Sequence, residues 1–346
     1  MNPPRPLPVD LSNRPGIIVT RTPLRLSLAG GGTDLSAFYE LEDGAVISSA
    51  IDKYIYVTVK KHGSFFDEPI RVNYSKSEMV EDVGEIENDI VRECLRFLHI
   101  DKPIYVSTVG DLPASSGLGG SSSFAVGLLN ALHAYRGERV TAGQLAEEAS
   151  HIEINVLDQP IGKQDQYAAA FGGLNFFEFR SGGSVRVEPV RVGSQLVENL
   201  FDHIMLFWTG LPRDAGTVLR EQRENTLDRR AMLCEMKAHA ERVRTHLVGP
   251  APDLAAVGST IHESWVLKRG LASTISTGDI DEWHAKAMEA GAWGGKVAGA
   301  GGGGFLMFIV PDECRDSVRM ALSGLVEVPV RHEVHGSQLV MPFLHP

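Results

Sequence analysis

A Gly/Ser-rich segment, residues 113–123 (PASSGLGGSSS), runs directly into an apolar segment with helical periodicity that continues to Arg136. The first backbone N–H groups of a helix have no partner inside the helix, and the helix dipole makes that end positive. Glycines before the first turn let an anion approach these groups closely. The segment therefore predicts a phosphate site for a nucleotide or a sugar phosphate. An ordinary loop capped by serine is the alternative.

Two further glycine-rich loops border strand-like segments. Residues 21–34 (RTPLRLSLAGGGTD) alternate in polarity and then reach three glycines, whereas residues 296–311 (KVAGAGGGGFLMFIVP) place the glycines before a strand. The latter contains Gly-x-Gly-x-x-Gly, but a dinucleotide-binding loop follows a strand and opens a helix, so this order excludes it. A Walker A loop is excluded as well, because Lys296 is followed by Val297.

A carboxylate in the segment 162–166 (GKQDQ) is the best candidate for a catalytic base. Asp165 stands beside a lysine at the start of a helix, where a carboxylate can stay ionised and accept a hydroxyl proton. The alternative is a solvated charge on a helix. The residue types alone favour the solvated charge.

The three loops, near residues 30, 118 and 302, resemble in sequence and order those of the GHMP kinase superfamily, which includes galactokinase, homoserine kinase and mevalonate kinase. The resemblance extends from about Ile17 to the C-terminus. Three stretches are most similar to the kinases of D-glycero-D-manno-heptose 7-phosphate: RTPLRLSLAGGGTDLSAFYE, AIDKYIYV and QPIGKQDQYAAAFGGLNFF. Related sugar 1-kinases, fucokinase above all, share much of the sequence of these stretches.

The resemblance assigns roles to residues of all three loops. It implies that Asp165 is the catalytic base, that Arg25 lies near the acceptor hydroxyl, and that ATP and Mg²⁺ are used. The residues implied to bind the nucleotide are Pro113, Ser115, Ser116, Gly117, Leu118, Gly119, Gly120, Ser121, Ser122, Gly301 and Gly302. The residues implied or considered for the sugar are Gly31, Gly32, Thr33, Asp34, Lys163, Gln164 and Arg213.

The metal ligands remain open between neighbouring residues. The resemblance points to Glu153 and Ser121 for Mg²⁺, with Glu147, Glu148 and Ser122 as alternatives. Residues 151–153 also imitate the His-x-Glu of zinc deaminases, but no Pro-Cys-x-x-Cys completes that signature, so zinc is rejected. An acceptor sugar that already carries a phosphate would need an additional cation to bind that phosphate. Lys163, Arg213 and Lys53 are candidates that the sequence does not rank.

Three functions are compatible with these residues. The first is an ATP-dependent kinase that transfers the γ-phosphoryl group to the anomeric hydroxyl of D-glycero-D-manno-heptose 7-phosphate, giving the 1,7-bisphosphate for nucleotide-activated heptose. The second is a kinase of an unphosphorylated sugar of fucose or galactose type. The third is a non-catalytic nucleotide-binding protein on the same fold. The presence of Asp165, Glu153 and all three loops favours an enzyme.

Composition is that of a globular chain and is compatible with an enzyme. The chain has 346 residues, 43% of them hydrophobic, and a formal net charge of −11 that argues against nucleic-acid and anionic-membrane partners. No run approaches the ~18 apolar residues of a membrane span. Cys94, Cys234 and Cys314 are far apart in helix-like stretches and are expected to be reduced. These features predict a cytoplasmic protein, and the oligomeric state is not indicated.

The elements that must position the loops read as an α+β chain. Strands are expected at 17–28, 45–51, 54–60, 104–109, 174–179, 185–190, 203–208 and 305–310, and helices at 121–136, 142–155, 162–171, 214–247, 253–274 and 279–291. Thr141-x-x-Gln144 predicts a capping box. Residues 1–16 are expected to form an extended arm. A break at 182–195 separates an N-terminal domain (17–188) from a C-terminal domain (189–346). The resemblance implies a ribosomal-protein-S5-like fold for the first domain, a ferredoxin-like fold for the second, and an active site between them.

Overall fold

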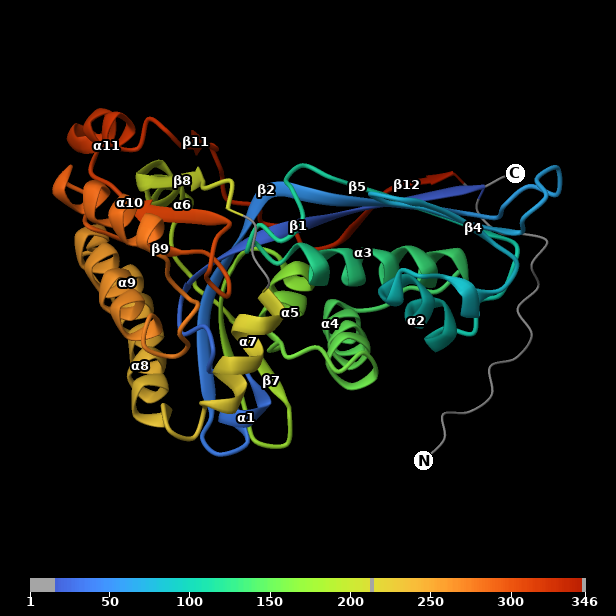
Figure 1. Ribbon diagram of the computed structural model, residues 1–346, viewed down its shortest axis with the longest axis horizontal. Coiled ribbons are helices and arrows are strands. Elements are labelled where there is room, and N and C mark those ends of the chain that lie inside the picture. Colours follow the sequence, from blue (N-terminus) through green and yellow to red (C-terminus); the bar gives the residue numbers. More distant parts are fainter. Residues whose placement is uncertain (1–15, 212–214, 344–346) are drawn as a thin grey trace.

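The computed structural model describes residues 16–211 and 215–343 (Figure 1). The arm expected at residues 1–16 lies outside this range apart from Gly16, and so does Arg213. None of the helices within the described ranges combines the length and the apolar character needed to cross a membrane.

The first sheet is built on two long antiparallel strands, β1 and β2. Along one half of β2 the sheet order is β12-β1-β2-β5-β3-β4, and along the other half β2 pairs with β6, which pairs with β7. All pairs are antiparallel except β3 with β5. The strands are β1 Ile17–Ala29, β2 Gly44–Lys60, β3 Ile70–Asn73, β4 Ser77–Val80, β5 Ile104–Gly110, β6 Leu174–Phe179, β7 Val185–Pro189 and β12 Gln338–Phe343.

The two strands expected at 45–51 and 54–60 are one continuous strand, β2. Leu24 pairs with Ile51 while Pro23 pairs with Tyr54, so two residues of β2 bulge out opposite this step of β1. Pro23 has no N–H to donate to the ladder, and a bulge lets the sheet continue past it. The sequence break at 52–53 therefore marks a bend in the sheet and not a turn.

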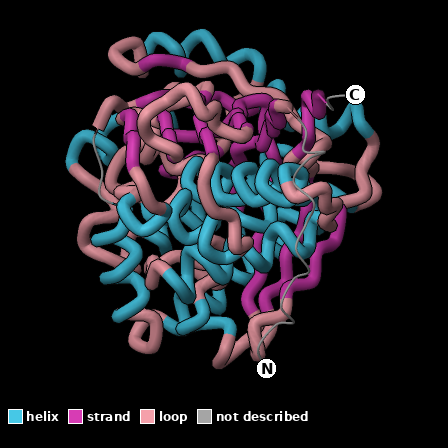
Figure 2. Tube along the Cα trace, turned by 90° about the vertical axis from the view of Figure 1, so that its right-hand side faces the viewer, coloured by secondary structure: helices cyan, strands magenta, loops and turns pink. Residues whose placement is uncertain are grey.

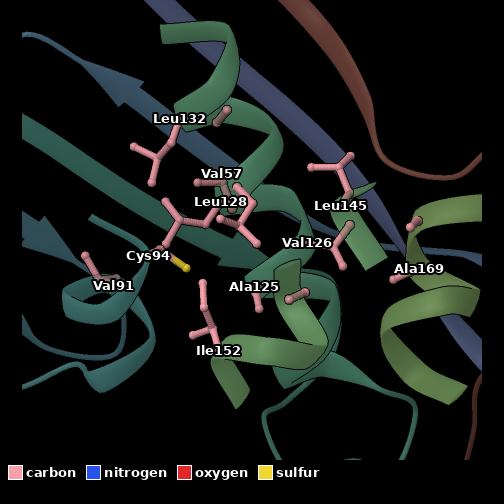
Figure 3. Packing of buried hydrophobic residues seen from close by; sticks show 14 of the residues in the cluster. Val57, Val91, Cys94, Ala125, Val126, Leu128, Leu132, Leu145, Ile152 and Ala169 are labelled. Atoms are coloured by element: carbon pink, nitrogen blue, oxygen red, sulfur yellow. The ribbon is translucent and has the colours of Figure 1, made fainter. Parts of the chain in front are cut away.

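Helices cover one face of this sheet, with α3 at the centre (Figures 1 and 2). Figure 3 shows Leu128 and Ala125 of α3 beside Cys94 of α2 and Ile152 of the π-helical turn that follows α4. Because α3 is surrounded by the sheet and by other helices, most of its residues are buried and not only one stripe. These helices are α1 Ser36–Tyr39, α2 Asp89–Phe97, α3 Gly120–Tyr135, α4 Ala142–Ser150, η3 His151–Val156 and α5 Gln164–Phe171, with a 3₁₀ turn, η2, at Val83–Glu85.

The second sheet has four antiparallel strands in the order β11-β8-β10-β9. Its strands are β8 Ile204–Trp208, β9 Gly294–Val297, β10 Phe305–Ile309 and β11 Val326–Glu327. The helices of this part are α6 Ser194–His203, α7 Ala215–Glu224, α8 Arg230–Val248, α9 Leu254–Lys268, α10 Gly278–Glu289 and α11 Arg315–Ala321, with a 3₁₀ turn, η4, at Asp312–Cys314. In Figure 1, α7 lies between the two helical groups, where it faces α5.

Three local expectations need correction. The helix expected at 214–247 is two helices, because the chain turns between α7 and α8; at this turn the Thr226 hydroxyl donates to the carbonyl oxygen of Gln222. The capping box is half formed, since Gln144 N–H donates to Thr141 Oγ1 but the Gln144 side chain donates to Glu148 instead. The last strand, β12, returns to pair with β1 in the first sheet, although the expected division placed it with the C-terminal part.

Candidate active site

Arg25 of β1 and Asp165 in the first turn of α5 form a bidentate ion pair. Arg25 Nε donates to Asp165 Oδ1 over 2.7 Å, and Arg25 Nη2 donates to Oδ2 over 2.8 Å. Nη1 donates to the carbonyl oxygen of Gly117 over 2.6 Å. The Arg25 side chain is 3% exposed and that of Asp165 is 24% exposed. Two parallel bonds fix both planar groups, so the carboxylate is held in one orientation while it still reaches the surface of a cavity.

Two adjoining pockets share this pair in their walls. Both are lined by Arg25, Ile161, Asp165, Leu219, Gly299 and Ala300. The first, which we call the Asp34 pocket, adds Ser27, Gly31, Gly32, Asp34, Leu35, Gly162, Gln164, Gln222, Lys268 and Lys296. The second, the Gly119 pocket, adds Ser115, Ser116, Gly117, Gly119, Gly120, Ser121, Ser122, Glu153, Gln159 and Gly216. A group bound in either pocket therefore meets the same carboxylate.

The second glycine loop forms the wall of the Gly119 pocket. Gly119 is the N-cap of α3 and has a left-handed backbone with φ of +79°. A Cβ at this position would lie 3.2 Å from Arg25 Cγ and 3.4 Å from the Asp165 carboxylate, so the loop passes directly over the ion pair. Gly120, Ser121 and Ser122, in the first turn of α3, line the same pocket, where the free N–H groups of a helix start can meet an anion. Pro113 and Leu118 are not in the lining, and Leu118 is buried in the core.

The third glycine loop packs against the second. A Cβ on Gly299 would lie 2.7 Å from Gly117 Cα, and one on Gly304 would lie 2.3 Å from the carbonyl oxygen of Ser116. Only glycine permits such close approach of two backbones. Gly299 and Ala300 line both pockets, whereas the expected residues Gly301 and Gly302 do not appear in either lining and lie against Ile275.

Asp34 is fixed at the wall of its pocket by backbone and side-chain donors. The N–H of Gly32 donates to Oδ1 over 2.9 Å, and the N–H of Gln164 donates to Oδ2 over 3.2 Å. Burial raises the pKa of Asp34, these hydrogen bonds counteract it, and the nearby Asp165 charge adds to the increase. Gly31, Gly32 and Gln164, to which the resemblance gives a role at the sugar, line the same pocket. Thr33 instead bonds Gly30 and Ala45 and fastens the loop to β2.

Glu153 lies on the π-helical turn after α4 and faces the Gly119 pocket. It accepts hydrogen bonds from Ser121 Oγ over 2.8 Å and from Gln166 Nε2 over 2.6 Å. Burial raises the pKa of Glu153, although the hydrogen bonds, including one from Ser122, lower it in part. π-Helical turns are frequent at functional sites. Here the extra residue brings a buried carboxylate beside the serines of the second loop.

This carboxylate and the adjacent hydroxyl fit Mg²⁺, which prefers hard oxygen ligands and keeps several waters. A cation would offset the cost of burying the charge of Glu153, and Gln166 Oε1 is buried without a hydrogen-bond partner among the described residues. The alternatives face elsewhere: Glu147 bonds Lys163, and Glu148 bonds His133. Within the described ranges, no group of three or more His, Cys, Asp or Glu residues could hold a metal ion.

The cations in the pockets differ from those that the sequence suggested. Lys163 Nζ pairs with Glu147 over 3.1 Å and Lys53 pairs with Asp52 over 3.3 Å, and neither lines a pocket. Lys268 and Lys296 line the Asp34 pocket, as does Gln222 of α7. The sequence pattern does not mark Lys268 or Gln222 as site residues, and the only sign for Lys296 is its position beside the third glycine loop.

Comparisons with known proteins agree with this geometry. The family models described as GHMP kinases N terminal domain and GHMP kinases C terminal match residues 73–173 and 233–323. The D-glycero-alpha-D-manno-heptose 7-phosphate kinase of Campylobacter jejuni subsp. jejuni serotype O:2 is 32% identical over 309 residues, which are 85% of this chain and 89% of that protein. The chain belongs to the GHMP kinase family.

Solved structures of GHMP kinase type superpose over nearly the whole chain. A crystal structure described as a D-glycero-D-manno-heptose 1-phosphate kinase from Bacteriodes thetaiotaomicron has a TM-score of 0.76 and 26% identity, and the match covers 94% of this chain and 99% of that one. A putative sugar kinase from Campylobacter jejuni gives 0.73 and 26%, covering 95% and 99%. The expected two-domain α+β GHMP kinase architecture is thereby confirmed. As a GHMP kinase, the protein is a phosphotransferase with an alcohol group as acceptor, in a family that uses ATP, generally with Mg²⁺.

Proposed function

We propose that this GHMP kinase transfers the γ-phosphoryl group of ATP to the anomeric hydroxyl of D-glycero-D-manno-heptose 7-phosphate. The observation that carries the proposal is the Arg25–Asp165 pair in the common wall of two pockets. One pocket has the glycine loop and helix start that suit nucleotide phosphates. The other has the carboxylate and amide groups that suit sugar hydroxyls. The similarity to the Campylobacter jejuni kinase supports the heptose 7-phosphate as acceptor.

In this reaction the acceptor hydroxyl approaches Asp165 from the Asp34 pocket. Each carboxylate oxygen of Asp165 accepts one bond from Arg25 and keeps a second lone pair, with which it can orient the hydroxyl and take its proton. Arg25 keeps the carboxylate in position and places positive charge beside the transferred group. The N–H groups at the start of α3 hold the phosphates, and the closely packed third loop closes the same site.

The metal would be held by Glu153 and by Ser121 or Ser122. When bound, Mg²⁺ neutralises part of the negative charge on the nucleotide phosphates. Glu153 and the serines would keep the positive charge of the metal ion in the Gly119 pocket. Asp165 would lie between the metal ion and the acceptor.

A coupled assay of ADP release over a panel of acceptors tests the proposal. The panel contains D-glycero-D-manno-heptose 7-phosphate, the corresponding 1-phosphate, the phosphate-free heptose, fucose and galactose, and ³¹P NMR of the product locates the new phosphate. We expect the 7-phosphate to have the highest kcat/KM and to give the 1,7-bisphosphate. Preference for a phosphate-free sugar or for the 1-phosphate would reject the acceptor, and absence of turnover with every sugar would favour a non-catalytic nucleotide-binding protein.

A further inference from the structure

Three cationic side chains meet at the Asp34 pocket, and two of them come from the C-terminal part of the chain. Lys296 of β9 and Lys268 at the end of α9 line this pocket together with Arg25, and neither lysine lines the Gly119 pocket. Lys296 is 5% exposed and Lys268 is 7% exposed. Lys296 Nζ donates to the carbonyl oxygen of Ser27 over 2.7 Å, and Lys268 Nζ donates to that of Gly299.

Lys296 is a buried ammonium group whose charged neighbours are also cations. Within the described residues it makes no ion pair with a carboxylate, and it donates to the carbonyl oxygens of Ser27 and Leu28. Burial lowers the pKa of Lys296 well below its ordinary value, and the charges of Lys268 and Arg25 lower it further. The carboxylates of the pocket are engaged elsewhere, since Asp165 binds Arg25 and Asp34 accepts bonds from Gly32 and Gln164. An anion bound here would therefore relieve an unfavourable arrangement of charge.

Two neutral groups of the same pocket also lack partners. Gln222 is 2% exposed and Ser27 is 6% exposed. Gln222 Nε2 and Ser27 Oγ nevertheless have no hydrogen-bond partner among the described residues. A Cβ on Gly32 would lie 2.3 Å from Gln222 Nε2, so this amide stands over the first glycine loop. Buried polar groups are normally satisfied. Their position suits the oxygens of a ligand that fills the pocket.

We propose that Lys296 and Lys268 bind the phosphate that the acceptor sugar already carries, with Gln222 and Ser27 donating to oxygens of the same molecule. This proposal rests on the sugar kinase function proposed above and specifies which residues select a phosphorylated acceptor. Lys296 offers one ammonium N–H beyond the two that bond β1. The nucleotide phosphates are held on the far side of Asp165, in a pocket whose lining contains neither lysine.

The test compares binding and turnover of heptose 7-phosphate with those of the phosphate-free heptose. Calorimetry measures the affinity of each sugar for the full chain, and the ADP assay gives kcat and KM for each sugar and for ATP. Lys296→Met and Lys268→Gln should weaken heptose 7-phosphate binding by about tenfold to 100-fold, the usual worth of hydrogen bonds to a charged group. The phosphate-free heptose and ATP should bind with nearly unchanged affinity.

Controls separate this role from a structural one. Lys286→Met removes an exposed lysine of α10 and should change neither sugar. Each variant is first checked for cooperative melting, because Lys296 also ties β9 to β1; if Lys296→Met does not fold, Lys268→Gln decides. Equal losses for both sugars, or a loss confined to ATP and kcat, would overturn the phosphate assignment. Normal binding of heptose 7-phosphate without its phosphorylation would instead contradict the proposed function alone.

Discussion

Arg25 and Asp165 are 140 residues apart in the sequence, yet their side chains are joined by two hydrogen bonds of 2.7 and 2.8 Å. Arg25 belongs to the central strand pair of the first sheet, and Asp165 belongs to a helix that packs on it. The pair thus connects the rigid part of the fold to the carboxylate that we propose as base. Removing either member should affect catalysis in a different way.

Asp165→Asn should lower kcat by about 10²–10⁴, the usual worth of general acid–base assistance. The amide can still accept a hydrogen bond from Arg25, so the fold and the ATP affinity should be retained. Steady-state kinetics, ATP calorimetry and thermal melting check these points. Asp279→Asn is the matched control, because Asp279 also lies in the first turn of a helix but on the surface. Turnover close to that of the unmodified enzyme would exclude Asp165 from the mechanism.

Arg25→Lys should impair both catalysis and nucleotide binding. Lysine keeps the charge but cannot make the bidentate contact with Asp165 while also reaching the Gly117 carbonyl oxygen. We expect kcat to fall and the KM for ATP to rise, each by about tenfold, the equivalent of one hydrogen bond to a charged group. A change in kcat alone would show that Arg25 does not support the second glycine loop.

Glu153→Gln should raise the Mg²⁺ concentration needed for half-maximal activity by about tenfold or more, which corresponds to ~1.4 kcal/mol of binding. The substitution removes an anionic ligand but keeps the shape of a side chain that is 1% exposed, so melting should change little. Titration of activity with Mg²⁺ measures the effect. Glu147→Gln serves as control, since Glu147 pairs with Lys163 outside the pockets. If the two variants require the same Mg²⁺ concentration, the metal ligand is another group.

The sequence anticipated those parts of the site that depend on local geometry. A glycine at 119 followed by serines and an apolar run is a local signal for a helix start, and the structure has the N-cap there with φ of +79°. Asp34 lies two residues after the last glycine of its own loop. Such features depend only on residues within one or two turns, so the local sequence is enough to predict them.

The missed residues reach the site through long-range packing. Lys296 bonds Ser27 across 269 positions of sequence, and this contact exists only because the second sheet packs beside β1. Nothing in the local pattern says which distant surfaces meet. Lys163 shows the converse, because it is next to Gln164 in sequence while its side chain turns away to Glu147 and the carbonyl oxygen of Gly183.

The stability of the helical layer should depend on pH through His133. Burial of the ring opposes its charged form, but the hydrogen bonds to Glu148 and Glu138 outweigh burial and raise the pKa of His133 above its ordinary value of 6.5. A raised folded-state pKa adds stability that is full below the unfolded-state pKa and is lost as the pH rises through the folded-state pKa.

Melting of the wild type and of His133→Gln between pH 5.5 and 9, a window set about the ordinary histidine pKa, measures this contribution. The melting temperature of the wild type should exceed that of the variant most at the acidic end, and this difference should shrink as the pH rises. Arg136 and Gln144 contact the same carboxylates and remain in both proteins. A difference that is constant across the range would show that His133 contributes packing and not charge.

Gly119→Val should abolish ATP binding although it removes no charge. A side chain here would need a left-handed backbone, and its Cβ would lie 3.2 Å from Arg25 and 3.4 Å from Asp165, inside the space that phosphates must enter. Gly137→Val is a close control, because Gly137 has the same φ of +79° and no atom within 4 Å of its Cβ position. Both variants pay for the backbone strain, so the difference in ATP affinity between them isolates the obstruction.

Gly302→Val extends the test to the third loop. Gly302 has φ of +77° and donates its N–H to the carbonyl oxygen of Ile275 over 2.8 Å, so it shapes the loop behind Gly299 and Ala300. We expect weaker ATP binding than in Gly137→Val but a smaller loss than in Gly119→Val, because the effect must pass through the loop to the pocket wall. Calorimetry on variants that melt cooperatively gives the order.

Unchanged ATP affinity in folded Gly119→Val would remove the phosphate-binding role of residues 113–123, and with it the main physical support for placing the nucleotide in the Gly119 pocket.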